Sequence, residues 1–211
     1  MTATPRPLAH ELLEFWFGPR PYDLSAATLR MPLWFGDVDP GRQQVFDREL
    51  AGRFGEAARA AAVGDFASWA ASPRRALALV LLLDQLPRNL QRGTAAAFAQ
   101  DRAALEIVVA GMQRGADAAL EPIERLFFYL PLQHAESLSV QEESVAASRR
   151  LVSEAPPAWQ PLLSGTLGYA QQHHDLIARF GRFPHRNAVL GRTTSPEEAT
   201  WLADGGERFG Q

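Results

Sequence analysis

The chain has 211 residues, of which 46% are hydrophobic and 21% charged, with a formal net charge of -3 at pH 7. This composition fits one globular domain over residues 1–211, and the absence of cysteine excludes disulfides, thiolate catalysis and zinc–thiolate sites. The net charge argues against wholesale nucleic-acid binding, and no apolar run is long enough to span a bilayer. Nothing near Met1 resembles a signal peptide. We therefore expect a cytoplasmic protein with neither a nucleic-acid nor a membrane partner.

Helical periodicity runs through the chain, and no stretch alternates convincingly as a strand does. In chain order, the predicted helices cover residues 10–17, 39–63, 74–86, 95–114, 122–130, 139–154, 158–180 and 196–202. Asp39-Pro40 and Ser72-Pro73 predict helix starts, Ser139 with Glu142 predicts a capping box, and Gly181 predicts a stop. The fold class is therefore all-α. Short connections predict antiparallel helix hairpins, either bundled or stacked as a right-handed solenoid without a clean sequence repeat.

The first polar segment is LLLDQLPRNLQRG, residues 81–93. Asp84 shares a helix face with Leu77 and Leu81, so it lies on the apolar stripe. Pro87 cannot donate to the carbonyl four residues back, which predicts an opened turn where a carboxylate orients its neighbours. The alternative is an Asp-Arg pair that only staples the helix end. The candidate ligand-binding residues of this segment are Asp84, Arg88, Asn89 and Arg92.

The second segment is FFYLPLQHAES, residues 127–137, in which Pro131 interrupts an apolar helix. His134 and Glu136 follow within one turn. A histidine in such a place is commonly a structural group with its hydrogen bonds satisfied, but with a carboxylate two residues on it is a candidate proton carrier. Both residues are therefore ligand-binding candidates.

The third segment is YAQQHHDLIARFGRFPHRN, residues 169–187. Helical spacing places His173 inward and His174 outward. His185 lies in a loop between arginines, whose charge should depress its pKa, and a neutral imidazole there suits a general base. His185 and His173 are the catalytic candidates, and Arg182, Arg186 and Asn187 are ligand-binding candidates. The alternative is that the arginines cap helix carbonyls and pair with acidic neighbours.

No fixed-spacing metal motif, phosphate loop, nucleophile elbow or dinucleotide fingerprint occurs in the sequence. A metal site would need three distant segments to converge beside surplus arginines, which oppose a divalent cation. We therefore expect neither a metal nor a cofactor.

The motifs DQLPRNLQRGTAAAFAQD, LPLQHAES and HHDLIARFGRFPHRNAVLGRTTSPEEATWL closely resemble a bacterial family known as domain of unknown function 924. LLEFWFG and WFG near the start extend the resemblance over nearly the whole chain. The resemblance implies an all-α, tetratricopeptide-like superhelix and supplies no activity. The polar residues that match the family motifs are Asp84, Gln85, Arg88, Asn89, Arg92, His134, Glu136, His173, Arg179, Arg182, His185, Arg186, Asn187 and Arg192.

Three functions fit these observations. The first is a polar, arginine- and histidine-lined pocket that binds a small anionic molecule, with acid/base catalysis as a variant. The second is a non-catalytic, tetratricopeptide-like scaffold that takes a partner's peptide carboxylate. The third is a buried polar network that holds helix hairpins in register. Few acidic residues adjoin the arginines in the sequence, which favours the ligand site and predicts that the three segments converge on one pocket. The ligand, the reaction and the oligomeric state stay open.

Overall fold

The computed structural model describes residues 7–36, 39–207 and 209. These residues form helices joined by short turns, and the described part of the chain contains no strand, which confirms the all-α class. The α-helices are α1 (Leu8–Phe17), α2 (Leu24–Phe35), α3 (Pro40–Ala62), α4 (Pro73–Val80), α5 (Leu86–Leu90), α6 (Asp101–Gln113), α7 (Pro122–Gln133), α8 (Leu138–Glu154), α9 (Gln160–Phe180) and α10 (Pro196–Ala203). Short 3-10 segments cover Ala67–Ala71, Ala95–Phe98, Asp117–Ala119 and Pro184–Arg186.

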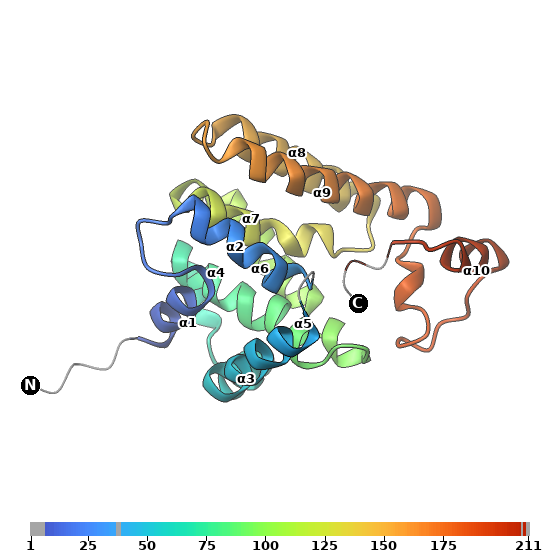
Figure 1. Cartoon of the computed structure of the whole chain (residues 1–211), viewed down its shortest axis with the longest axis horizontal. Coiled ribbons are helices and arrows are strands. Elements are labelled where there is room, and N and C mark those ends of the chain that lie inside the picture. The colour runs from blue at the N-terminus through green and yellow to red at the C-terminus, as the bar shows by residue number, and fades with distance from the viewer. Residues whose placement is uncertain (1–6, 37–38, 208, 210–211) are drawn as a thin grey trace, which may run out of the picture.

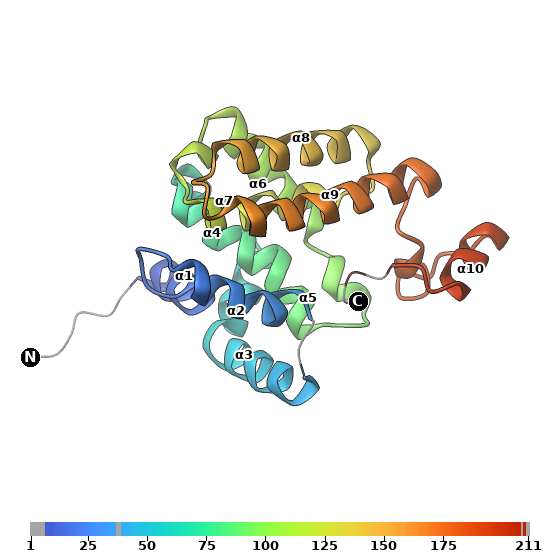
Figure 2. The same ribbon diagram turned by 45° about the horizontal axis from the view of Figure 1, so that its top comes forward.

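Two helices, α8 and α9, form an antiparallel pair along one side of the molecule, and α8 also packs on α7 (Figure 1). Helices α1 and α3 lie on the opposite side, with α4 and α5 between (Figure 2). Helix α10 lies beyond the C-terminal end of α9. The α8–α9 pair is a hairpin of the predicted kind, whereas the superhelical stacking of such pairs stays a prediction.

An aromatic cluster around Phe127 joins the N-terminal helices to α7. The ring centroid of Phe127 lies 4.8 Å from that of Trp34, 5.3 Å from Phe17 and 5.8 Å from Trp16. All four side chains are buried. Burying one such ring stabilises the fold by about 1.5–3 kcal/mol. The tryptophans of the LLEFWFG and WFG motifs are therefore core residues.

Most predicted helix ends agree with the structure, because local cap chemistry sets them. The Asp39 side chain accepts hydrogen bonds from two N–H groups of the first turn of α3. Gly181 ends α9 with a φ of +69°, in the left-handed region that glycine adopts without steric cost. Ser195 and Glu198 form a reciprocal capping box at α10.

Helix α2 was not predicted from the sequence. Both of its ends have regular caps, since the Asp23 side chain accepts a hydrogen bond from the N–H of Ala26 and Gly36 ends the helix. However, Pro32 lies inside the helix, and only Ala27 and Trp34 are buried. Such a sparse apolar stripe gives little helical periodicity.

Further predictions of helix ends were wrong. The helix expected over 95–114 starts at Asp101 after a 3-10 segment, and the one expected over 74–86 runs through the π turn to Leu90. Helix α8 starts after Ser137 rather than at Ser139, and no described side chain caps it, so the capping box expected from Ser139 and Glu142 does not form. Helix α7 continues through Pro131 to Gln133. Because this proline lies in the last turn, it removes only one hydrogen bond near the end of the ladder.

Candidate functional site

The helix that carries the first polar segment widens into a π turn at Leu81–Gln85. Pro87 has no N–H, so the Leu83 carbonyl lacks its α-helical partner. The N–H of Leu86 instead bonds five residues back, to the first carbonyl of the turn. Asp84 lies in this turn with 0% exposure. The opening predicted ahead of Pro87 is confirmed, and it holds a carboxylate inside the protein.

Asp84 has three side-chain partners. Its Oδ1 lies 2.7 Å from Nδ1 of His134 and 3.2 Å from Nη1 of Arg88, and its Oδ2 accepts from Nε2 of Gln85 at 2.6 Å. Burial alone would raise the pKa of the Asp84 carboxyl, but the charge of Arg88 and the contact with His134 outweigh it and hold the pKa well below its usual range. The prediction that Asp84 is buried against a motif arginine is confirmed.

His134 is held as a neutral ring. Burial and the positive charge of Arg88 lower the pKa of His134, and the Asp84 carboxylate only partly opposes them. Since an ionised carboxylate can only accept hydrogen bonds, the proton of the neutral ring lies on Nδ1 and points to Asp84. Nε2 then carries a lone pair that can accept a hydrogen bond or a proton.

His173 lies beside His134, with ring centroids 6.2 Å apart. Its Nδ1 bonds the carbonyl of Tyr169 at 2.8 Å, which fixes the proton on Nδ1. Its ring stacks on Phe209 with centroids 3.6 Å apart. Burial, followed by the proximity of His134, lowers the pKa of His173 to about 3, so this ring is also neutral at pH 7. The inward orientation predicted for His173 is confirmed by its 5% exposure.

Two buried arginines share one carboxylate behind these histidines. Oδ2 of Asp101 lies 2.9 Å from Nη2 of Arg88 and 3.3 Å from Nη1 of Arg186. Together with Asp84, the group therefore contains two cations and two anions. Asp101 lies outside the three polar segments and was not a candidate, although it is the last residue of the motif DQLPRNLQRGTAAAFAQD.

Arg186 is enclosed by aromatic rings. Its guanidinium carbon lies 4.6 Å from the ring centroid of Phe98 and 4.4 Å from that of Phe183. Its Nη1 also donates to the carbonyl of His134 at 3.1 Å. Burial and the charge of Arg88 lower the pKa of Arg186 to about 10, which leaves it protonated at pH 7. Arg186 thus orders the loop at His134.

The remaining C-terminal motif residues form a separate clamp. Arg182 makes a two-point contact with Glu198, at 2.6 and 2.7 Å, and Asn187 donates to the same carboxylate. Glu136 accepts from the Phe183 N–H and from Arg192. These contacts fasten the loop after α9 to α10 and to the end of α7. The acidic partners come from other segments, so this part of the network has the structural role that was one of the alternatives.

The three predicted segments meet only in part. Those that converge are Asp84, Arg88, His134, His173 and Arg186. Arg92 instead contacts Asp47 of α3, at 3.1 Å. His185 is half-buried, with its ring centroid 5.6 Å from Phe183 and 5.8 Å from Phe209. Asn89 is buried, and its Nδ2 has no hydrogen-bond partner among the residues described.

A pocket of about 300 Å³ opens at the two histidines, between α2, α7 and α9. Its walls are mostly apolar, and no arginine lines it among the described residues. The lining residues are Met31, Pro32, Phe35, Leu126, Leu130, Gln133, His134, Thr166, Tyr169, His173, Glu207 and Phe209. Sequence reasoning missed most of them. Tyr169, which shares a helix face with His173, is the one that spacing could have identified.

A second hollow, of about 420 Å³, lies on the other side of His134. Asp101, Glu136 and Arg186 are among its lining residues, so it adjoins the charged cluster. His134 therefore lines both spaces.

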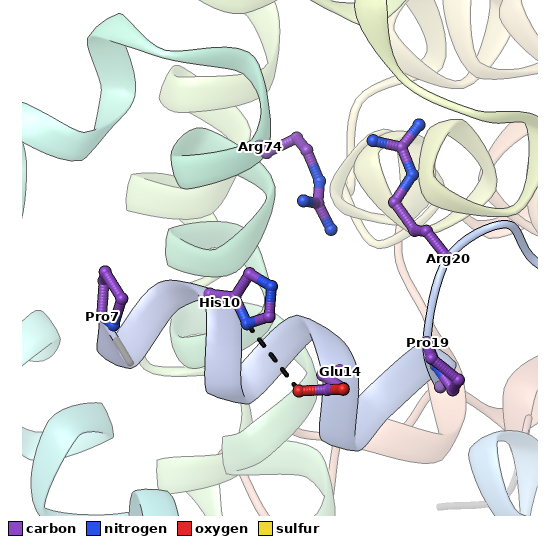
Figure 3. Close-up of a pocket in the computed structure, with 7 residues that line it drawn as sticks. Pro7, His10, Glu14, Pro19, Arg20 and Arg74 are labelled. Carbon is purple, nitrogen blue, oxygen red and sulfur yellow. Dashed lines mark ion pairs between the residues drawn. The ribbon is translucent and has the colours of Figure 1, made fainter. Parts of the chain in front are cut away.

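A third hollow, of about 490 Å³, lies against α1 and contains none of the predicted site residues (Figure 3). Arg74 and Arg20 extend toward it from opposite sides, above His10 and Glu14 of α1. Nε of Arg74 donates to the buried Glu124 at 3.0 Å, and Arg20 pairs with Glu121. Both cations thus have carboxylate partners, and this hollow is not a free anion site.

Neither a metal cluster nor a membrane span is found in the part of the chain that the structure describes. No group of three or more metal-ligating side chains is close enough together there to hold an ion. None of the described helices has the length and apolarity that a membrane crossing requires.

Comparisons with known proteins agree on kinship and leave activity open. A family model described as "Bacterial protein of unknown function (DUF924)" matches residues 12–206. A solved structure of ATU0120, a protein of unknown function from Agrobacterium tumefaciens, is 37% identical in sequence with a TM-score of 0.75, and the match covers 94% of this chain and 98% of that one. No curated protein matches.

Proposed function

Because the chain belongs to the bacterial family of unknown function DUF924, we propose its function from the site itself: it binds a small molecule in the pocket between α2, α7 and α9, where His134, oriented by Asp84, accepts or donates a proton. The observation that carries this proposal is the 2.7 Å contact between Asp84 and His134 at the pocket wall. A carboxylate behind an imidazole fixes its tautomer and stabilises the imidazolium that forms when the ring takes up a proton.

The pocket has the properties of a small-molecule site. Its volume of about 300 Å³ is at the lower end of the usual range for such sites. Apolar walls with a few convergent polar groups and titratable residues of shifted pKa are typical of binding and catalytic pockets. A buried carboxylate in a π turn adds support, since π turns occur frequently at functional sites.

Among the histidines, the geometry favours His134 for proton transfer. His173 has no carboxylate partner to stabilise its protonated form among the described residues, and its pKa of about 3 makes it a weak base at pH 7. We assign His173 a binding role. His185 does not line this pocket.

The expected anionic ligand and the scaffold alternative both need arginines with free N–H groups. Arg88, Arg182 and Arg186 each contact a carboxylate, and Nε of Arg186, which has no hydrogen-bond partner among the described residues, is buried. An arginine-lined groove for a peptide carboxylate therefore has less support than the histidine pocket. The tetratricopeptide-like scaffold remains the alternative if no small molecule binds.

The test monitors the histidine ring nitrogens by NMR while n-hexanol is titrated into the full chain. We expect the signals of His134 and His173 to shift with saturation, whereas His10 and His174, which lie outside the pocket, serve as internal controls. A second titration uses Leu126→Trp, which fills the pocket and should abolish the shifts. Uniform small shifts at all histidines would contradict the proposal.

A further inference from the structure

Both pocket histidines have already used their ring proton. His134 donates Nδ1–H to Asp84, and His173 donates Nδ1–H to the carbonyl of Tyr169. In a neutral imidazole the other nitrogen then carries only a lone pair. Within the described residues no hydrogen bond involves Nε2 of either ring, and both histidines line the pocket. The pocket therefore has access to two hydrogen-bond acceptors on rings 6.2 Å apart.

A carboxylate among the lining residues is also a hydrogen-bond acceptor. Glu207, at the rim, carries a carboxylate. The nearby cations, Arg88 and Arg186, direct N–H groups to Asp101 and to the carbonyls of Asp84 and His134. The side chains of Gln133 and Tyr169 can donate or accept hydrogen bonds, so they are compatible with a ligand that donates to the histidines.

The walls of the pocket fit an apolar body. Met31 and Phe35 come from α2, Leu126 and Leu130 from α7, and Phe209 lies over His173. A ligand that places an apolar chain against these side chains brings its polar end to the two histidines. A carboxylate at that end would face the two Nε2 lone pairs, a pairing that costs free energy in a partly desolvated site.

We infer that the ligand of this pocket is an apolar molecule with a hydrogen-bond donor, a hydroxyl or an amine, at the end that faces Nε2 of His134 and His173. This rests on the proposed function and specifies its ligand class. The inferred ligand also differs from the one expected from the sequence, where the arginines indicated an anion. A hydroxyl or amine bound here donates to His134, the base of the proposed pair with Asp84.

Three molecules with one body and three head groups test the inference: n-hexanol, n-hexylamine and hexanoate. Each is titrated into the full chain at neutral pH, and Kd is read from the His134 and His173 ring signals. We expect hexanol and hexylamine to bind at least about tenfold more tightly than hexanoate. Equal or tighter binding of hexanoate overturns the inference and leaves the proposed function standing. If none of the three shifts these signals, both fail.

Two variants locate the contacts. His173→Phe keeps a ring that can stack on Phe209 but removes an acceptor, and we expect it to weaken hexanol binding about fivefold, with His174→Phe on the same helix as the matched control. Glu207→Gln should weaken hexylamine and leave hexanol unchanged. If His173→Phe, with its fold verified by circular dichroism, binds all three molecules as the natural chain does, the inference is overturned.

Discussion

Asp84 and His134 are 50 positions apart in the chain, and their side chains meet at 2.7 Å inside the protein. The π turn supplies the carboxylate, and the loop after α7 supplies the imidazole. Arg88 contacts the Asp84 carboxylate, Arg186 donates to the His134 carbonyl, and Asp101 bridges the two arginines. The contact is thus both a tertiary link between helices and the polar centre of the proposed pocket.

The replacement Asp84→Asn should destabilise the protein. It removes a buried charge that faces Arg88 and His134 while keeping the side-chain shape, and breaking such a buried pair costs about 3 kcal/mol. The free energy of unfolding by urea measures the loss. Glu106→Gln is the control, because its ion pair with Arg102 has side chains 66% and 91% exposed and should change stability by less than about 0.5 kcal/mol. Equal effects of the two variants would contradict the assignment.

The stability of the protein should fall as the solution is acidified below neutral pH. The pKa of His173 drops from its ordinary 6.5 to about 3 in the folded state. Between these values the unfolded chain binds a proton that the folded chain excludes, so the stabilisation present above pH 6.5 is lost as the pH falls. The slope for one such group approaches about 1.4 kcal/mol per pH unit.

Urea denaturation from about pH 7 to about pH 5 isolates the histidines, because the lowered pKa values of Asp84, Glu136 and Glu198 act at lower pH. His134, whose pKa is also lowered, should contribute in the same sense. His173→Phe is expected to flatten the slope, whereas His174→Phe should retain it. An unchanged slope in His173→Phe would show that this ring is protonated in the folded protein.

The C-terminal clamp should be separable from the pocket. Glu198→Gln weakens the contacts with Arg182 and Asn187, and α10 together with the loop after Gly181 should then exchange its amide hydrogens faster. The site at Asp84 and His134 has other supports, so hexanol binding should persist. Hydrogen exchange by mass spectrometry measures the first effect and the histidine signals measure the second. Loss of hexanol binding in this variant would mean that clamp and pocket act as one unit.

Two helical glycines should respond in opposite ways to alanine. A Cβ at Gly111 of α6 would lie 2.7 Å from the ring of Phe128, whereas one at Gly52 of α3 meets nothing within 4 Å. Gly111→Ala should therefore destabilise by about 1–3 kcal/mol through overpacking. Gly52→Ala should stabilise by about 1 kcal/mol, because alanine is the better helix former. Thermal unfolding compares both, and destabilisation of equal size in the two variants would contradict the packing seen at Phe128.

Local chemistry was predictable from the sequence, and long-range pairing was not. Caps such as Asp39 and the stop at Gly181 depend on neighbours within one turn, and the burial of Asp84 agrees with its helix face. The partner carboxylates Asp101 and Glu198 lie 13 and 16 positions after Arg88 and Arg182, inside the same family motifs, but helical spacing does not predict contacts over such intervals. The sequence interpretation therefore counted too many free cations and expected an anion.

The pocket could not be predicted from the sequence for a related reason. Much of its apolar wall belongs to α2, whose weak periodicity and internal Pro32 concealed it. Without that helix, His134 and His173 had no apolar enclosure, and the polar motif residues appeared to form the whole site.

The π turn at Leu81–Gln85 also sets the rotational phase of the helix that contains it. Each residue of an α-helix advances the side-chain direction by about 100°, and a π turn accommodates an extra residue without moving the later side chains onto another face. Removing one residue from the turn would let α4 and α5 join as one regular helix with the later side chains on nearly the same faces, but the widened turn that holds the Asp84 carboxylate would be lost. The stripe that begins at Leu77 and the guanidinium of Arg88 would then still face the same neighbours, so the change would be confined to the turn and its carboxylate. A single-residue deletion here therefore tests whether the proline and its widened turn are as much a part of the site as the carboxylate they hold.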